Sequence, residues 1–201
     1  QVLEEQGVFD QNTFNHLVKE YITENSIPEE DLSNKNESSI PSLVRDYCSE
    51  FPSINKEYQL AYMELLLNNL IRFIGSDFTL LHPVVYTSGY PAQKYATQMI
   101  TGSYPLSVVL DMTEDSAIQF ASRYASEKFD SFDEYVQASM EDFLNLHNGL
   151  FNVNISNSYS DELGLEPPMS GDKGQIENQA PMYVFPALFS FGIVNIVLSE
   201  L

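Results

Sequence analysis

Positive charge is scarce in this chain. Of its 201 residues only 9 are Lys or Arg, against 29 Asp and Glu, which gives a formal net charge of −20. A surface of this sign repels phosphate groups, so we expect neither nucleic acid nor an anionic membrane as a partner. The charge balance says little about the fold, which has to be inferred from the pattern of apolar residues.

Cysteine is equally scarce, and long apolar runs are absent. The single cysteine, Cys48, cannot form a disulfide within the chain, which is typical of proteins in the reducing cytosol. We find no signal peptide and no apolar stretch long enough to span a bilayer, so we expect a cytoplasmic protein. The chain starts at Gln1 rather than at methionine, which suggests a piece of a longer or processed protein.

Recognisable catalytic and cofactor-binding motifs are missing as well. The chain has no glycine-rich phosphate loop and no GxSxG nucleophile elbow. Its three histidines lie far apart and in none of the spacings that bind metals: His16, His82 and His147. We therefore expect no metal and no cofactor of its own.

Apolar patterning predicts an α+β fold, with a largely antiparallel sheet and long helices packed on it. Hydrophobic residues make up 43% of the chain, enough for one sizeable core. Residues 1–56 are predicted to form a helical N-terminal extension, and residues 57–201 the main domain. Helices are expected near 13–22, after Pro41, over 58–74 and from Thr113, and strands over 84–87, 94–101, 106–112, 182–188 and 193–198. The stretch 157–180 is expected to be rich in turns.

The most informative stretch is a predicted helix over Ser131–Phe151. Ser131 and Glu134 have the spacing of a capping box, which would start this helix. Its core-facing residues recur every three or four positions: Phe132, Val136, Met140, Phe143 and His147. On this stripe, His147 is expected to be a packed and hydrogen-bonded histidine rather than a metal ligand. After the helix, residues 151–155 alternate in polarity, which fits either a strand or a frayed continuation.

The opposite side of this helix carries the candidate site. Asp142 and Asn145 are three residues apart, so a carboxylate and a carboxamide point the same way. Glu141 adjoins them, and the small residues Ala138 and Gly149 lie about one turn to either side, which leaves room for a large partner. A solvated helix face is the alternative interpretation, although such faces are more often filled with Lys, Glu and Gln.

A faint internal repeat includes the same positions. Residues 63–68 and 140–145 share four of six amino acids, 77 positions apart. The first copy has Leu65 where the second has Asp142, so only the second can present the acid–amide pair. The repeat is explained either by one ancestral unit or by chance.

The helix and its flanks resemble the CheC/CheX/FliY family of chemotaxis phosphatases, and are closest in layout to CheX. In that family a long helix carries an acidic residue, two spacers and Asn, commonly continues to Gly, and is followed by Pro a little over twenty residues later. Here Asp142-Phe-Leu-Asn145-Leu-His-Asn-Gly149 has that order, and Pro168 stands 23 positions after Asn145. The segments 103–124 and 185–200 resemble the family's strand–turn–helix and its final strand pair.

The resemblance implies a CheC-like sandwich over roughly 58–201, and a phosphatase that hydrolyses the aspartyl phosphate of a CheY-like response regulator. It implies that Asn145 orients the attacking water and that Asp142 pairs with the regulator's Lys, with Ala138, Glu141 and Gly149 in the docking face. Mg²⁺ is expected in the partner receiver domain, so no cofactor is expected here. A homodimer through a sheet edge is expected by the same analogy.

Two positions depart from the family pattern. Asp142 stands where the family usually has Glu, so its side chain is shorter by one methylene, and Ala138 stands where related motifs often carry Asp or Ser. Glu141 is an alternative acid, four residues from Asn145. Two other hypotheses also stay open: a catalytically silent CheX-like module that binds a receiver domain or self-associates, and an unrelated enzyme with its pocket elsewhere.

Overall fold

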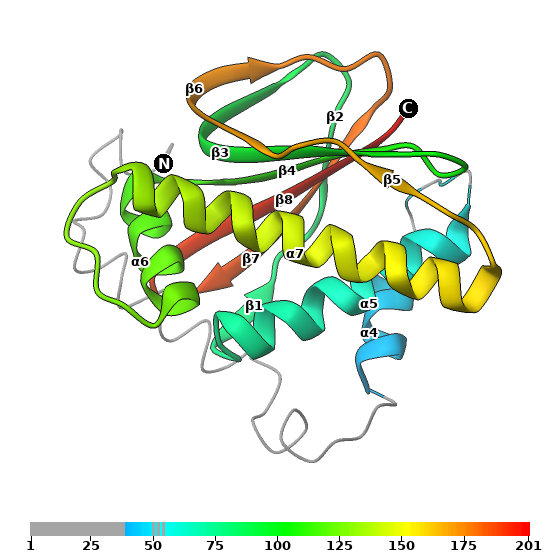
Figure 1. The fold of residues 1–201 in the computed structure, drawn as a ribbon, viewed down its shortest axis with the longest axis horizontal. Helices are drawn as coiled ribbons and strands as arrows, with labels where there is room; N and C mark the ends of the chain where they lie inside the picture. Colours follow the sequence, from blue (N-terminus) through cyan, green and yellow to red (C-terminus); the bar gives the residue numbers. More distant parts are fainter. Residues whose placement is uncertain (1–38, 50, 52, 54) are drawn as a thin grey trace.

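The computed structural model describes residues 39–49, 51, 53 and 55–201 (Figure 1). The helix predicted near residues 13–22 lies outside the described residues. The helices are α4 (Ser39–Tyr47), α5 (Lys56–Phe73), α6 (Glu114–Ala125) and α7 (Glu134–Tyr159). The strands are β1 (Phe78–Leu80), β2 (Val84–Tyr86), β3 (Tyr90–Thr101), β4 (Leu106–Met112), β5 (Gly164–Leu165), β6 (Met169–Ile176), β7 (Met182–Phe189) and β8 (Gly192–Glu200).

The strands form one eight-stranded sheet in which every pairing is antiparallel. Its order is β1-β7-β8-β4-β3-β5, with β2 also paired to β7 and β6 also paired to β3. The two hairpins β3–β4 and β7–β8 meet along β4 and β8, which places the final strand pair in the middle of the sheet. The predicted α+β architecture with a largely antiparallel sheet is confirmed.

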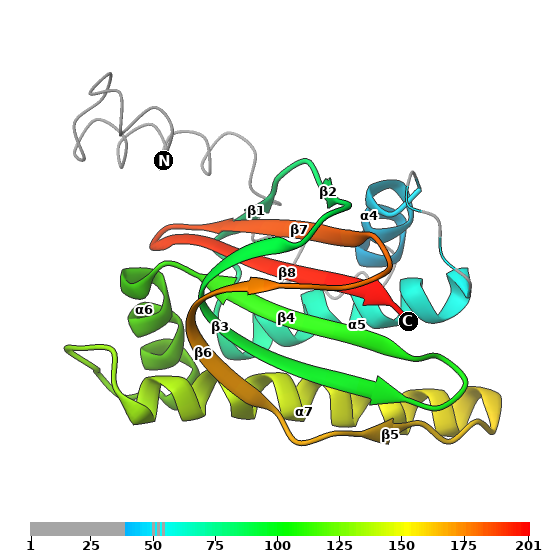
Figure 2. The same cartoon turned by 90° about the horizontal axis from the view of Figure 1, so that it is seen from above.

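The helices cover one face of this sheet, and Figure 2 looks onto the sheet with α5 and α7 behind the strands. Alternate residues along β4 and β8 divide between the two faces, as the period of two in a strand requires. Val108 and Ile196 belong to the large core beneath the helices, whereas Val109 and Val197 belong to a smaller cluster on the other face. Because the large core takes residues from α4, α5, α6 and α7 together, it fixes the rotation of each helix about its axis.

The N-terminal end of α7 differs from the prediction. The helix begins at Glu134, and its cap is Asp133, whose carboxylate accepts hydrogen bonds from the amides of Tyr135 (3.0 Å) and Val136 (3.1 Å). The capping box of Ser131 with Glu134 is therefore wrong. An aspartate directly before the first turn satisfies the free amides itself, so a cap two residues earlier is not needed.

Two further segments differ from or sharpen the prediction. After Gly149 the chain continues as helix to Tyr159, because Phe151 and Ile155 extend the buried stripe at four-residue spacing from His147. The stretch 157–180, expected to be rich in turns, contains β5 and the eight-residue strand β6, which were not predicted. The short strand β1 was also not predicted.

The other predicted elements are present, some with shifted bounds: the helix expected after Pro41 begins at Ser39, and the strand expected over 94–101 begins at Tyr90. β4 has the predicted bounds 106–112, and the turn at 101–105 joins β3 to β4 as a hairpin. Thr113 caps α6, and Gly75 (φ +136°) follows the end of α5 in the left-handed region that glycine favours. Of the described helices, none is long and apolar enough to cross a membrane.

Candidate functional site

The site is built on α7, whose buried face is continuous over its whole length. The buried residues are Val136, Met140, Phe143, Leu144, His147, Asn148, Phe151 and Ile155. With the exception of Phe132, which is half-buried before the helix starts, the predicted inward stripe is confirmed. Because this face is packed against the sheet and the neighbouring helices, the exposed residues Ala138, Asp142 and Asn145 lie on the other side of the helix.

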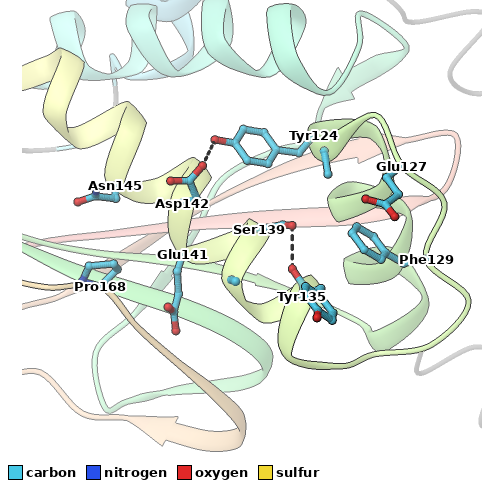
Figure 3. Close-up of a pocket in the computed structure, with 11 residues that line it drawn as sticks. Tyr124, Glu127, Phe129, Tyr135, Ser139, Glu141, Asp142, Asn145 and Pro168 are labelled. Carbon is cyan, nitrogen blue, oxygen red and sulfur yellow. Dashed lines mark hydrogen bonds between the residues drawn. The ribbon is translucent and has the colours of Figure 1, made fainter.

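The outward face of α7 opens into a cavity of about 980 Å³. Asp142, Asn145 and Ala138 are exposed there, and Glu141 is half-buried. The wall opposite α7 comes from other segments: Tyr124, Ala125, Glu127, Phe129 and Pro168. Figure 3 shows Asp142 and Asn145 close together on α7, with Pro168 facing Asn145 and Glu141 directed away from Asp142. The acid, the amide and the proline of the predicted motif are thus brought together in space.

Asp142 is held by a side chain of α6. Its Oδ2 accepts a hydrogen bond of 2.7 Å from the hydroxyl of Tyr124. Burial and this hydrogen bond raise the pKa of the Tyr124 hydroxyl above its usual value, so it remains a donor. The Tyr124 ring packs edge-on against Phe143 (5.7 Å between centroids) and Phe73 (6.0 Å), which fixes the hydroxyl. The other carboxylate oxygen has no partner among the described residues.

Asn145 is held by Gln98, a buried residue of β3. The Nε2 of Gln98 donates to Asn145 Oδ1 and to the Glu166 carbonyl oxygen, both at 2.8 Å. Glu166 comes two residues before Pro168, so this one side chain ties α7 to the segment that brings Pro168 to the cavity. The amide nitrogen of Asn145 has no acceptor within the described part of the chain, and it is available to donate.

His147 does not belong to the site. It is fully buried, its Nδ1 lies 3.0 Å from Asn69 Nδ2, and the Tyr62 ring packs edge-on against it at 4.6 Å. Burial lowers the pKa of His147 to about 3, so the ring is neutral near pH 7. The prediction of a packed, hydrogen-bonded histidine is confirmed.

The remaining predicted docking residues divide into two groups. Ala138 and Glu141 line the cavity, whereas Gly149 lies beyond Asn145 and outside the lining. A Cβ added at Gly149 would meet no atom of this chain within 4 Å, so the surface there is open. The role of Ala138, Glu141 and Gly149 in docking stays a prediction.

The charge of the cavity is of one sign. Glu127, Glu141 and Asp142 line it, and none of the described lining residues is Lys or Arg. Such a site attracts a cationic group of a partner. Among the described residues no group of three or more His, Cys, Asp or Glu side chains could hold a metal ion.

Sequence reasoning missed Gln98 and Tyr124, the two residues that orient the acid–amide pair. Gln98 is the one polar side chain between Ala96 and Ile100 on the core face of β3, which is an unusual position for an amide. That signal was available in the sequence, but it does not name the partner. Tyr124 lies on α6, and no pattern in the sequence links it to Asp142.

Comparison with known proteins gives matches of structure only. No protein-family model matches the chain, and no curated protein matches it. A CheC-like superfamily protein from Shewanella sp. PV-4 has a TM-score of 0.63 at 16% identity, over 74% of this chain and 99% of that one. CheX from Vibrio vulnificus has a TM-score of 0.60 at 14% identity, over 72% of this chain and 99% of that one.

A third match is CheX from Borrelia burgdorferi, whose structure is a complex with CheY, BeF3 and Mg²⁺. Its TM-score is 0.59 at 16% identity, over 71% of this chain and 97% of that one. At these identities the likeness shows the fold. The chain has the fold of the CheC and CheX chemotaxis proteins, and the predicted resemblance is confirmed at that level.

Proposed function

We propose that this protein hydrolyses the aspartyl phosphate of a CheY-like response regulator. The observation that supports this most directly is the shared cavity of Asp142 and Asn145, which project from one helix face beside Pro168. The same order of acid, amide and proline led to the CheC/CheX resemblance, and the fold agrees with it. The CheX–CheY complex is a property of the Borrelia protein, and we extend receiver binding to this chain as part of the proposal.

Phosphoryl transfer suits a site of this kind, because it depends on positioning and charge neutralisation more than on covalent catalysis. Asn145 would enter the receiver's active site and hold a water in line with the phosphorus. A bond forms between the water oxygen and phosphorus, while the bond from phosphorus to the aspartyl oxygen breaks. The products are inorganic phosphate and the receiver's free aspartate, and the water's proton passes to phosphate or solvent.

Asp142 would fix the docking register by pairing with the Lys of the receiver. An ion pair in this position aligns the partner and favours encounter, and the negative cavity adds to the attraction. The small side chain of Ala138 leaves space for the receiver backbone beside the pair. Mg²⁺ would be held by the receiver's own acidic residues, so this chain does not need to supply a metal ligand. A homodimer through a sheet edge stays a prediction.

A second candidate is a CheX-like module that binds a receiver without hydrolysing its phosphate. One observation favours it: the carboxylate of Asp142, already shorter than Glu, is drawn to the Tyr124 hydroxyl of its own chain. If that contact persists on docking, the acid cannot approach the receiver's Lys as closely as a Glu would.

The decisive experiment measures the lifetime of phosphorylated receiver domains from the same cell, with and without the purified protein. We expect at least one receiver to lose its phosphate faster. Unchanged lifetimes together with measurable binding to a BeF3-activated receiver would favour the silent module. Unchanged lifetimes and no binding to any receiver would contradict both candidates.

A further inference from the structure

Behind Asn145 lies a chain of hydrogen-bonded amides that reaches into the core. The Tyr62 hydroxyl donates to Asn148 Oδ1, Asn148 Nδ2 donates to Gln98 Oε1, and Gln98 Nε2 donates to Asn145 Oδ1, each at 2.8 Å. Tyr62, Asn148 and Gln98 are at most 2% exposed. Three elements contribute to this network: α5, α7 and β3. Among the described residues only its last member, Asn145, reaches the cavity.

The direction of every bond in this network is determined by one group. The Glu166 backbone carbonyl can only accept, and it lies 2.8 Å from the terminal atom of Gln98, so that atom must be the NH2 nitrogen. The oxygen of Gln98 then faces Asn148, which must present its own NH2 there. On the other side Gln98 has a donor for Asn145, which must therefore turn its oxygen inward. Amide orientations are assigned from such networks, and a carbonyl anchor removes the ambiguity.

We propose that Gln98 is a positioning residue that fixes which edge of the Asn145 amide is presented to the cavity. This inference rests on the proposed function. With its oxygen held by Gln98, Asn145 offers its NH2 group to the attacking water or to a phosphoryl oxygen, in a fixed rotamer. Asn145 is exposed, and without Gln98 its amide would rotate freely between two orientations. A group set in advance in its reactive geometry raises turnover without needing to raise affinity.

Gln98 also ties the position of Asn145 to that of the segment that carries Pro168. Its two N–H groups bridge α7 to Glu166, and the Glu166 amide in turn donates to the Met99 carbonyl at 3.0 Å. Both sides of the cavity are therefore hydrogen-bonded to two adjacent residues of β3, Gln98 and Met99. A change in the length of the 146–167 segment would shift Pro168 relative to the amide.

The test compares Gln98→Met with Tyr62→Phe in the receiver dephosphorylation assay. Methionine keeps the length and volume of glutamine but has no donor, whereas Tyr62→Phe removes a buried hydrogen bond at the far end of the network and leaves the Glu166 anchor in place. We expect both variants to melt at lower temperature. We expect only Gln98→Met to lose turnover, by about tenfold to a hundredfold, with little change in KM.

A double-mutant cycle separates positioning from general damage. On an Asn145→Ala background, Gln98→Met should cause no further loss of turnover, because it acts through the missing amide. A further loss of the same size would overturn the proposal, and so would equal losses in Gln98→Met and Tyr62→Phe. An inactive wild-type protein would contradict the proposed function itself, which is a different result.

Hydrogen exchange followed by NMR tests the geometry without activity, even if Gln98→Met does not fold. Both side-chain amide protons of Gln98 are hydrogen-bonded in a buried position, and we expect them to exchange slowly. The Asn145 side-chain amide protons should exchange at the rate of an exposed amide. Fast exchange at Gln98, or protection at Asn145, would refute the assigned direction of the network.

Discussion

Replacing Asn145 by alanine should greatly lower the catalytic activity while hardly changing the stability of the fold. The residue is exposed in the middle of α7, and the substitution removes one hydrogen bond, from Gln98, whose nitrogen keeps its second bond to Glu166. Losing such a bond costs about 1 kcal/mol. Alanine recovers up to about 0.7 kcal/mol through its better helix propensity. The free energy of unfolding should therefore change by less than about 1 kcal/mol.

The expected effect on catalysis is much larger. If Asn145 holds the water or stabilises the phosphoryl oxygens, its loss should resemble the loss of one preorganised donor, about 2.7–4 kcal/mol in the transition state. That corresponds to a turnover roughly a hundredfold to a thousandfold lower. The measurement is the decay of phosphorylated receiver at saturating concentrations of the variant, alongside urea unfolding of the same preparation.

The chain contains a matched control in α5. Asn68 occupies the position equivalent to Asn145 in the 77-residue repeat, it is also exposed, and its side chain bonds only to the Glu64 carbonyl of its own helix. Asn68→Ala should leave dephosphorylation unchanged. Activity of Asn145→Ala within threefold of wild type, or an equal loss in Asn68→Ala, would refute the assignment of Asn145.

Three other predictions concern the neighbours of this amide. Asp142→Ala should weaken binding to a BeF3-activated receiver by roughly tenfold, and less at high salt, whereas no change in Kd at any salt concentration would contradict an ion pair. The pKa of His147 is about 3 in the folded protein and 6.5 in the unfolded chain, so on acidification the unfolded chain binds a proton that the folded protein does not. The free energy of unfolding should therefore decrease as the pH is lowered. The contribution is about 2 kcal/mol between pH 7 and pH 5. It should be absent from urea unfolding of His147→Gln. Gly149→Ala should stabilise α7 by about 1 kcal/mol and yet weaken receiver binding, and unimpaired binding would remove Gly149 from the docking face.

The fold was predictable where apolar periodicity is strong. β4 and the final strand pair were found because their buried residues form short, dense runs, and α6 because Thr113 caps an obvious apolar stripe. The strand β6 was missed because it is polar and half-exposed, with two glycines. Its Gly171 is favoured by a partner in β3, since a Cβ there would lie 2.4 Å from the ring of Tyr95 as that ring is placed. A residue chosen by a distant neighbour leaves no local pattern.

The site was predictable to the same extent and for the same reason. Asp142 and Asn145 lie on one helix, so their common direction follows from the spacing of three, and Pro168 was found through the family resemblance. Gln98 and Tyr124 lie on β3 and α6, and only the folded chain brings them to α7. The first turn of α7 was misread because Ser131 and Asp133 both suit a cap, and the choice between them depends on where the preceding loop arrives.

The packing of α4 has a practical consequence. Val44 and Cys48 are fully buried in the large core, and the Phe51 ring packs against Phe185 of the central hairpin. Burial raises the pKa of the Cys48 thiol to about 11, and it is the only cysteine in the chain. A thiol reagent should therefore label the protein only when α4 and the residues that follow it move away from the sheet. The rate of Cys48 labelling, followed by mass spectrometry, therefore reports how often α4 detaches from the core, and no engineered probe is needed.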